Sequence, residues 1–185
     1  SYPEYLSVFS VVFQDFALTA LPLGQNVASA ASYDREAAVS CLKKAGFGDR
    51  LDQLPKGLDT YLGKDLNEDG VDMSGGEKQK IALARALYKD AAFIVLDEPT
   101  AALDPIAEAE IYSRFNAIIE DKTAIYISHR LSSCKFCDDI LVFDKGSVIQ
   151  QGRHDALVAD AAGKYHALWH AQAQYYDDAG AGVLV

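Results

Sequence analysis

The stretch "AAFIVLDEP", Ala91–Pro99, decides the fold that this sequence predicts. Its apolar run ends in two acids and a proline, the pattern of a strand covered on both faces. The segment "KTAIYISH", Lys122–His129, has a similar apolar run. Between them, Asp104 and Pro105 are expected to begin a helix whose apolar residues recur three and four positions apart. A strand, a helix and a strand in this order predict an α/β fold with a parallel sheet.

Another strand and a helical segment precede this unit. The stretch "YLSVFSVVFQDF", Tyr5–Phe16, alternates and is rich in β-branched and aromatic residues, which predicts a strand ending near Phe13. From about residue 23 to residue 90 the composition is helical, and Asp34 is expected to cap one of the helices. After the sheet, "DDILVFDKGSVIQQG" predicts a hairpin that turns at Lys145–Gly146. Two short helices and a frayed tail are expected to follow.

The composition excludes several classes of protein. A formal net charge of -10 argues against a nucleic-acid-binding surface. No apolar run approaches the roughly 18 residues that span a bilayer, and the first residues carry no basic leader, so we expect a soluble chain without a secretory signal. Cys134 and Cys137 form a C-x-x-C without a second pair. A structural zinc site takes about four ligands, so we interpret both as small apolar residues.

Polar side chains follow each expected strand. Gln14 follows the first, Asp97 and Glu98 the second, and His129 the third. Because the carboxyl ends of parallel strands meet at one edge of a sheet, these side chains are expected to converge there. Carboxylates in that position can hold Mg²⁺ and activate a water molecule. Each residue alone is more often a helix cap or a loop residue, so the prediction depends on their joint occurrence.

The stretch "VDMSGGEKQKIALARALYKD", residues 71–90, adds an anion-binding element. Gly75 and Gly76 allow the backbone to approach a phosphate at the positive end of a helix. The alternative is an ordinary helix start, with Ser74 as the cap and Glu77 completing a capping box. The two interpretations remain open at this point.

Taken together, "MSGGEKQKIALARAL", "FIVLDEPTAALDP" and "IYISHR" resemble the nucleotide-binding domain of an ATP-binding cassette transporter. The order and spacing of five motifs agree, from Val11 to about Tyr176, and the C-terminal part looks most like the exporter type. Two departures are Glu77, where exporters more often have Gln, and Phe13, where Pro commonly stands. The resemblance implies a partial RecA-like P-loop NTPase core with an inserted α-helical subdomain.

The resemblance also implies site residues and cofactors, ATP and Mg²⁺. Glu98 would be the general base, His129 would hold the γ-phosphate, and Gln14 would sense the metal. Asp97, with Gln14, would bind Mg²⁺. The remaining residues implied to bind ATP, from this face or across a head-to-tail dimer, are Ser74, Gly75, Gly76, Glu77, Gln79 and Asp104.

One motif of the family does not occur in the chain. A P-loop reads G-x-x-x-x-G-K followed by Ser or Thr. In "GLDTYLGKD", Gly57–Asp65, five residues separate the glycines and Asp65 replaces the hydroxyl residue. An anion there would repel phosphate, so we reject this stretch. We expect the P-loop to lie N-terminal to Ser1 and the chain to be an inactive fragment of a longer ATPase, with a natural degenerate subunit as the alternative.

The domain organisation follows from the same comparison. We expect the core to comprise residues 1–24 and 91–152, the helical subdomain residues 25–90, and C-terminal helices with a frayed tail residues 153–185. The implied partners are a second nucleotide-binding domain and the transmembrane domain of the parent chain, at the cytoplasmic face of the plasma membrane, with no nucleic acid. Alternatives are a chromosome-maintenance or DNA-repair ATPase, an importer ATPase, and a non-catalytic module that contributes only its signature face.

Overall fold

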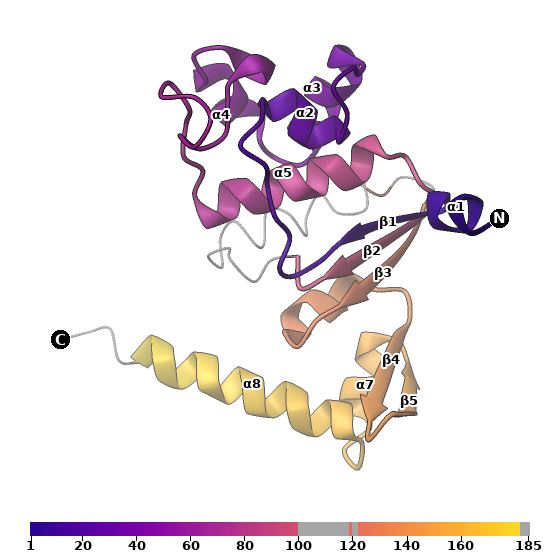
Figure 1. Cartoon of the computed structure of the whole chain (residues 1–185). Helices are drawn as coiled ribbons and strands as arrows, with labels where there is room; N and C mark the ends of the chain where they lie inside the picture. Colours follow the sequence, from indigo (N-terminus) through magenta and orange to yellow (C-terminus); the bar gives the residue numbers. More distant parts are fainter. Residues whose placement is uncertain (100–118, 120–121, 182–185) are drawn as a thin grey trace. The chain divides into compact units, whose positions relative to one another are not determined.

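A computed structural model of the chain describes residues 1–99, 119 and 122–181 (Figure 1). The described elements fall into two compact units, residues 1–127 and 128–185. In the first unit they are α1 (Tyr2–Ser7), β1 (Phe9–Val12), α2 (Leu23–Ala28), α3 (Arg35–Lys44), α4 (Gly48–Gln53), η1 (Gly57–Asp59), α5 (Gly75–Tyr88), β2 (Phe93–Asp97) and β3 (Thr123–Ile127). In the second they are η2 (Leu131–Phe136), β4 (Ile140–Asp144), β5 (Ser147–Gly152), α7 (His154–Ala159) and α8 (Lys164–Ala181).

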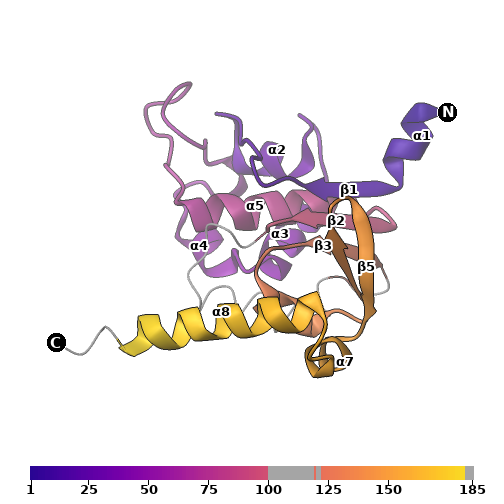
Figure 2. The same ribbon diagram turned by 90° about the horizontal axis from the view of Figure 1, so that it is seen from below.

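A three-stranded parallel sheet forms the base of the first unit. The strand order is β1-β2-β3, with Val12 beside Leu96 and Leu96 beside Tyr126. The α/β fold with a parallel sheet is therefore confirmed. All three strands run in one direction, so their carboxyl ends lie at the same edge (Figures 1 and 2).

Helix α5 covers one face of this sheet (Figure 1). Its buried residue Ile81 belongs to the same apolar core as Val12, Ile94 and Leu96. Alternate residues of a strand point to opposite faces, so these three strand residues share the face that α5 covers. Helices α2 and α3 pack against α5 from the other side. The core of the first unit is therefore the layer that α5 makes with the sheet and with the helical segment.

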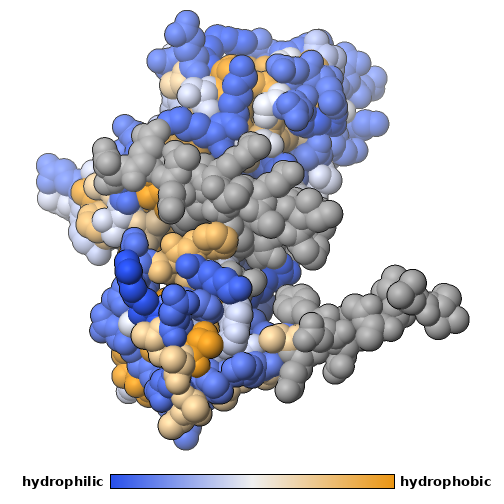
Figure 3. Space-filling model, turned by 180° about the vertical axis from the view of Figure 1, so that it is seen from behind, coloured by the Kyte–Doolittle hydropathy of each residue, from blue (hydrophilic) through white to orange (hydrophobic). Residues whose placement is uncertain are grey.

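The opposite face of the sheet carries partly exposed apolar side chains. The side chains of Phe93, Ile125 and Ile127 are 38%, 46% and 51% exposed. The helix expected to begin at Asp104 lies outside the described residues, so the expectation that β2 and β3 are covered on both faces stays a prediction. Figure 3 shows, by contrast, that hydrophilic residues predominate on the visible face of the helical segment.

The N-terminal strand starts later than its sequence indicates. Residues 2–7 form helix α1, in which the Ser1 amino group lies 2.6 Å from Glu4 Oε2 and a proline occupies the first turn. Those two features favour a helix start and outweigh the alternating pattern of the following residues. The strand itself ends at Val12, one residue before the predicted end.

The second unit contains an antiparallel hairpin and two helices. Strands β4 and β5 are joined at Lys145 and Gly146, whose φ angles are 49° and 79°. Two successive positive φ angles are typical of a type I′ turn, so the predicted turn is confirmed. Helix α8 extends to Ala181, beyond the point where we expected a frayed tail. Among the described helices, none combines the length and the apolar composition needed to cross a bilayer.

Candidate functional site

The acidic pair lies where β2 ends. Asp97 is the last residue of the strand and Glu98 follows it, both half-buried. The Glu98 backbone has a φ of 48°, and its N–H donates to the Ile127 carbonyl, 2.9 Å away. Left-handed φ angles are uncommon outside glycine, and strained backbone of this kind concentrates at functional sites. The bond to the end of β3 fixes the backbone from which the Glu98 side chain projects.

A buried side chain from α5 contacts the same residue. Gln79 is only 5% exposed, and its Nε2 donates to the Glu98 carbonyl at 3.2 Å. Glu98 is therefore held from two directions, by β3 and by the helix that follows the two glycines. Gln79 lies beneath the surface here, and its implied contact with ATP stays a prediction.

The start of α5 has the capping geometry of an ordinary helix. The Glu77 N–H donates to Ser74 Oγ at 3.3 Å, and the Ser74 N–H donates to Glu77 Oε2 at 2.7 Å. The capping box is thus present, and Gly75 and Gly76 form the first turn. Ser74 and Gly75 are exposed, so the positive end of α5 faces solvent. The two interpretations are compatible, because a capped helix start still presents N–H groups to an anion.

An ion pair strengthens this helix start. Arg50 Nε, from α4, lies 2.6 Å from Glu77 Oε1. Desolvation is the largest single effect on the Glu77 carboxyl and raises its pKa. The hydrogen bonds with Ser74 and the charge of Arg50 together outweigh it, and the pKa falls below the ordinary value. Glu77 therefore contributes structure to the helix start as a carboxylate.

Gln14 lies at the same sheet edge as the acidic pair. It follows β1 by two residues and its side chain is exposed. Val12 and Leu96 form the last pair between β1 and β2, and Gln14 and Glu98 each follow this pair by two residues in the chain. Gln14 and the acidic pair therefore follow the carboxyl ends of neighbouring strands, and their joint role stays a prediction.

Two residues missed in the sequence hold the segment after Gln14. Arg85 of α5 donates from Nε to the Asn26 carbonyl at 2.8 Å and from Nη1 to the Ala17 carbonyl at 3.2 Å. Asn26 is 2% exposed, and its Oδ1 accepts from the Thr19 N–H at 2.9 Å. Since the partners of Arg85 are 59 and 68 residues away in the chain, no local pattern could have revealed this anchor.

His129 belongs to the second unit. It follows β3 by two residues and is exposed. Gln172 of α8 contacts the backbone on both sides of the next residue: its Nε2 donates to the His129 carbonyl at 2.6 Å, and its Oε1 accepts from the Leu131 N–H at 3.0 Å. This contact could not be predicted from the sequence, because a single glutamine on a helix has no distinctive pattern. The predicted site residue Asp104 lies outside the described residues.

The oxygen ligands at the β2 end fit a magnesium ion. Among the described residues, no group of three or more His, Cys, Asp or Glu side chains could hold a metal. Mg²⁺ commonly binds through one or two carboxylates, with water molecules and substrate phosphates completing its shell. Asp97, at the end of a strand beside Glu98, fits that pattern as a protein ligand for nucleotide-bound Mg²⁺.

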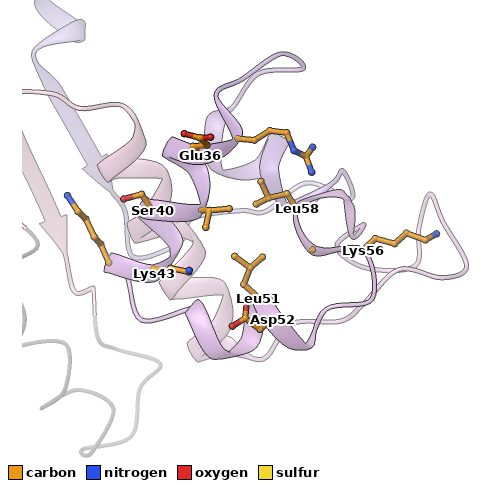
Figure 4. A pocket seen from close by; sticks show the side chains of 11 residues that line it. Glu36, Ser40, Lys43, Leu51, Asp52, Lys56 and Leu58 are labelled. Carbon is orange, nitrogen blue, oxygen red and sulfur yellow. The ribbon is translucent and has the colours of Figure 1, made fainter.

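A separate pocket lies in the helical segment. It has a volume of about 740 Å³ and lies between α3, α4 and η1 (Figure 4). Leu51 and Leu58 line its apolar part, and Lys43, Glu36 and Asp52 are charged residues around it. None of the predicted site residues lines this pocket.

Comparisons with known proteins agree with this geometry. The family model described as "ABC transporter" matches residues 2–101, more than half of the chain. The chain belongs to the ABC transporter family. An ABC transporter relative, the ATP-dependent lipid A-core flippase of Idiomarina loihiensis, is 40% identical over 166 residues, which cover 89% of this chain and 28% of the flippase. The human mitochondrial iron-sulfur clusters transporter ABCB7 is 39% identical over 137 residues, which cover 74% of this chain and 18% of the transporter.

A solved structure in the ABC transporter family has the same fold. A bacterial Atm1-family ABC exporter, solved with ATP bound, superposes with a TM-score of 0.82 at 34% identity. The match covers 94% of this chain and 30% of the exporter chain. The predicted family, its exporter type and the partial RecA-like core are thereby confirmed. The chain spans less than a third of the length of these relatives.

Proposed function

We propose that this chain forms part of the ATP-binding and ATP-hydrolysing domain of an ABC exporter. The observation that supports this most strongly is the hydrogen bond from the buried side chain of Gln79 to the Glu98 carbonyl. It connects the helix that begins at Ser74 to the acidic pair at the end of β2. A signature-type helix start and a strand-end carboxylate are thus parts of one packed unit.

Each site residue has a specific role in the proposed reaction. Glu98, held at its backbone on both sides, accepts a proton from the attacking water as general base. Asp97 would hold Mg²⁺, and the ion would supply positive charge to the phosphates. Gln14, which follows the neighbouring strand, would sense the metal. His129 binds the γ-phosphate, with Gln172 holding its backbone.

The proposed partners follow from the surface of the first unit. The exposed start of α5, at Ser74 and Gly75, is suited to contact a γ-phosphate held by a second nucleotide-binding domain. We propose a head-to-tail pair of such domains, each completed by a P-loop and joined to a transmembrane domain at the cytoplasmic face of the plasma membrane. ATP-driven export by the whole protein rests on this arrangement and on the named functions of the relatives.

The proposal is tested by Glu98→Gln in the longer protein that contains this chain. A general base contributes about 10²- to 10⁴-fold to a rate. We expect ATP hydrolysis to fall by at least about 100-fold, with binding of a fluorescent ATP analogue retained. Glu68→Gln is the matched control, because Glu68 is exposed in a loop of the helical segment. Hydrolysis unchanged by Glu98→Gln would exclude the assigned role.

A further inference from the structure

The C-x-x-C of the second unit closes a tight turn. It lies at the end of the 3-10 helix η2, and the Cys137 N–H donates to the Cys134 carbonyl at 3.1 Å. A turn with this hydrogen bond brings the two Cα atoms within about 7 Å. A 3-10 helix rises about 2.0 Å per residue and has three residues per turn, so the two side chains project from the same side about 6 Å apart. Disulfides bridge Cα separations of about 4.4 to 6.8 Å.

Both thiols face the small apolar core of the second unit. Cys134 and Cys137 are half-buried and pack against a cluster that includes Tyr165. The Tyr165 hydroxyl is hydrogen-bonded to Cys134 and lies 2.9 Å from His154 Nδ1. Burial and, to a smaller extent, the charge of Cys134 raise the pKa of Cys137. Both cysteines therefore lie in one partly desolvated site, three residues apart across the hydrogen-bonded turn.

We propose that Cys134 and Cys137 form a reversible intramolecular disulfide by exchange with a low-molecular-weight disulfide such as glutathione disulfide. The Cys134 thiolate attacks one glutathione sulfur, the glutathione S–S bond breaks, and one glutathione thiolate leaves. The Cys137 thiolate then attacks the Cys134 sulfur and displaces the second glutathione. Two protein thiols are oxidised, one glutathione disulfide is reduced, and the two thiol protons pass to the two glutathione thiolates.

The surroundings set the order of attack and the stability of the product. Desolvation raises the pKa of both thiols, that of Cys137 to about 11. Hydrogen bonds from Ser133 and Tyr165 partly offset this for Cys134, which makes it the first nucleophile. A disulfide is a strong oxidant when the reduced, dithiol form of the protein is stabilised. Neither thiolate is well stabilised here, so the disulfide forms slowly at neutral pH and persists once formed.

The test uses the full chain and mass spectrometry. Reduced protein is incubated with excess glutathione disulfide, and peptides are mapped over time. We expect the peptide containing both cysteines to lose two hydrogens, while Cys41 of α3 forms at most a glutathione adduct. Cys137→Ser is expected to stop at the adduct on Cys134, and Cys134→Ser to give no intramolecular product. Circular dichroism of each variant verifies its fold.

A repositioned pair tests the role of the turn. The double variant Phe136→Cys with Cys137→Ser keeps two thiols but changes their spacing to C-x-C. Because the hydrogen-bonded turn then no longer joins them, we expect loss of the closed product. The proposal is overturned if the wild-type cysteines stay reduced, if both end as separate adducts, or if the repositioned pair closes equally fast.

Discussion

Replacing Gln172 by Leu removes the contact between α8 and the segment that carries His129. The amide of Gln172 forms one hydrogen bond as donor, to the His129 carbonyl, and one as acceptor, from the Leu131 N–H. Leucine has a similar volume but no polar atom. The Leu131 side chain is in the core of the second unit, with the residue 8% exposed, so its N–H has little access to water.

The size of the effect follows from these two bonds. A hydrogen bond contributes about 0.5 to 1.5 kcal/mol net, and a buried donor left unsatisfied costs about 1 to 3 kcal/mol. The bond to His129 is exposed, which favours the lower part of these ranges. We expect local opening to become easier by about 1 to 2 kcal/mol. Because 1.4 kcal/mol corresponds to a tenfold change, exchange of the Leu131 amide should accelerate by about 5- to 30-fold.

Hydrogen exchange resolved at single amides measures this acceleration. Gln172→Glu is an informative companion, because it keeps an acceptor for the Leu131 N–H and loses the donor to His129. We expect it to retain most of the protection. Gln151→Leu is the control, since Gln151 Nε2 donates to Asp139 elsewhere in the same unit. A folded Gln172→Leu variant with unchanged exchange at Leu131 would refute the assigned contact.

Two further predictions concern the first unit. The carboxyl of Glu77 has a lowered pKa when folded, so its stabilisation is complete above its unfolded pKa of about 4.5 and is lost as the pH falls through the lower folded value. Glu77→Gln should therefore flatten the decline in melting temperature below that pH. An unchanged profile would contradict the combined effect of the Ser74 hydrogen bonds and Arg50 on this carboxyl. Arg85→Met should lower the free energy of unfolding by about 1.5 to 3 kcal/mol in urea titrations, because it removes charged hydrogen bonds to two backbone carbonyls. The control Arg35→Met breaks an exposed pair with Asp59 and should have a clearly smaller effect on the free energy of unfolding. Equal effects of the two variants would count against the anchoring role of Arg85.

The sequence predicted the elements whose signals are local. A continuous apolar run identified β2, and the hairpin turn at Lys145 and Gly146 followed from turn chemistry. Asp34 caps α3 as expected, with its carboxylate accepting from two backbone N–H groups. These features depend on neighbouring residues, so one stretch of chain contains the information that defines them.

The contacts that organise the site were not predictable in the same way. Gln79 and Gln172 act through hydrogen bonds to backbone groups 19 and 41 to 43 residues away. Such bonds form only after packing has brought distant segments together. No periodic sequence pattern predicts which backbone group an amide side chain will contact. The sequence therefore predicted candidate residues for the proposed chemistry, but not the residues that hold their backbone in place.

The exposed side chains on the sheet face opposite α5 have a practical consequence for work with this chain. Phe93 lies on the central strand β2, and Ile125 and Ile127 lie on β3, which is an edge strand among the described residues. Surfaces and edges of this kind promote association between copies. Concentrated samples should therefore scatter more light as they age. The substitution Ile125→Lys, at the centre of β3, should slow that increase and leave α5 and the acidic pair unchanged.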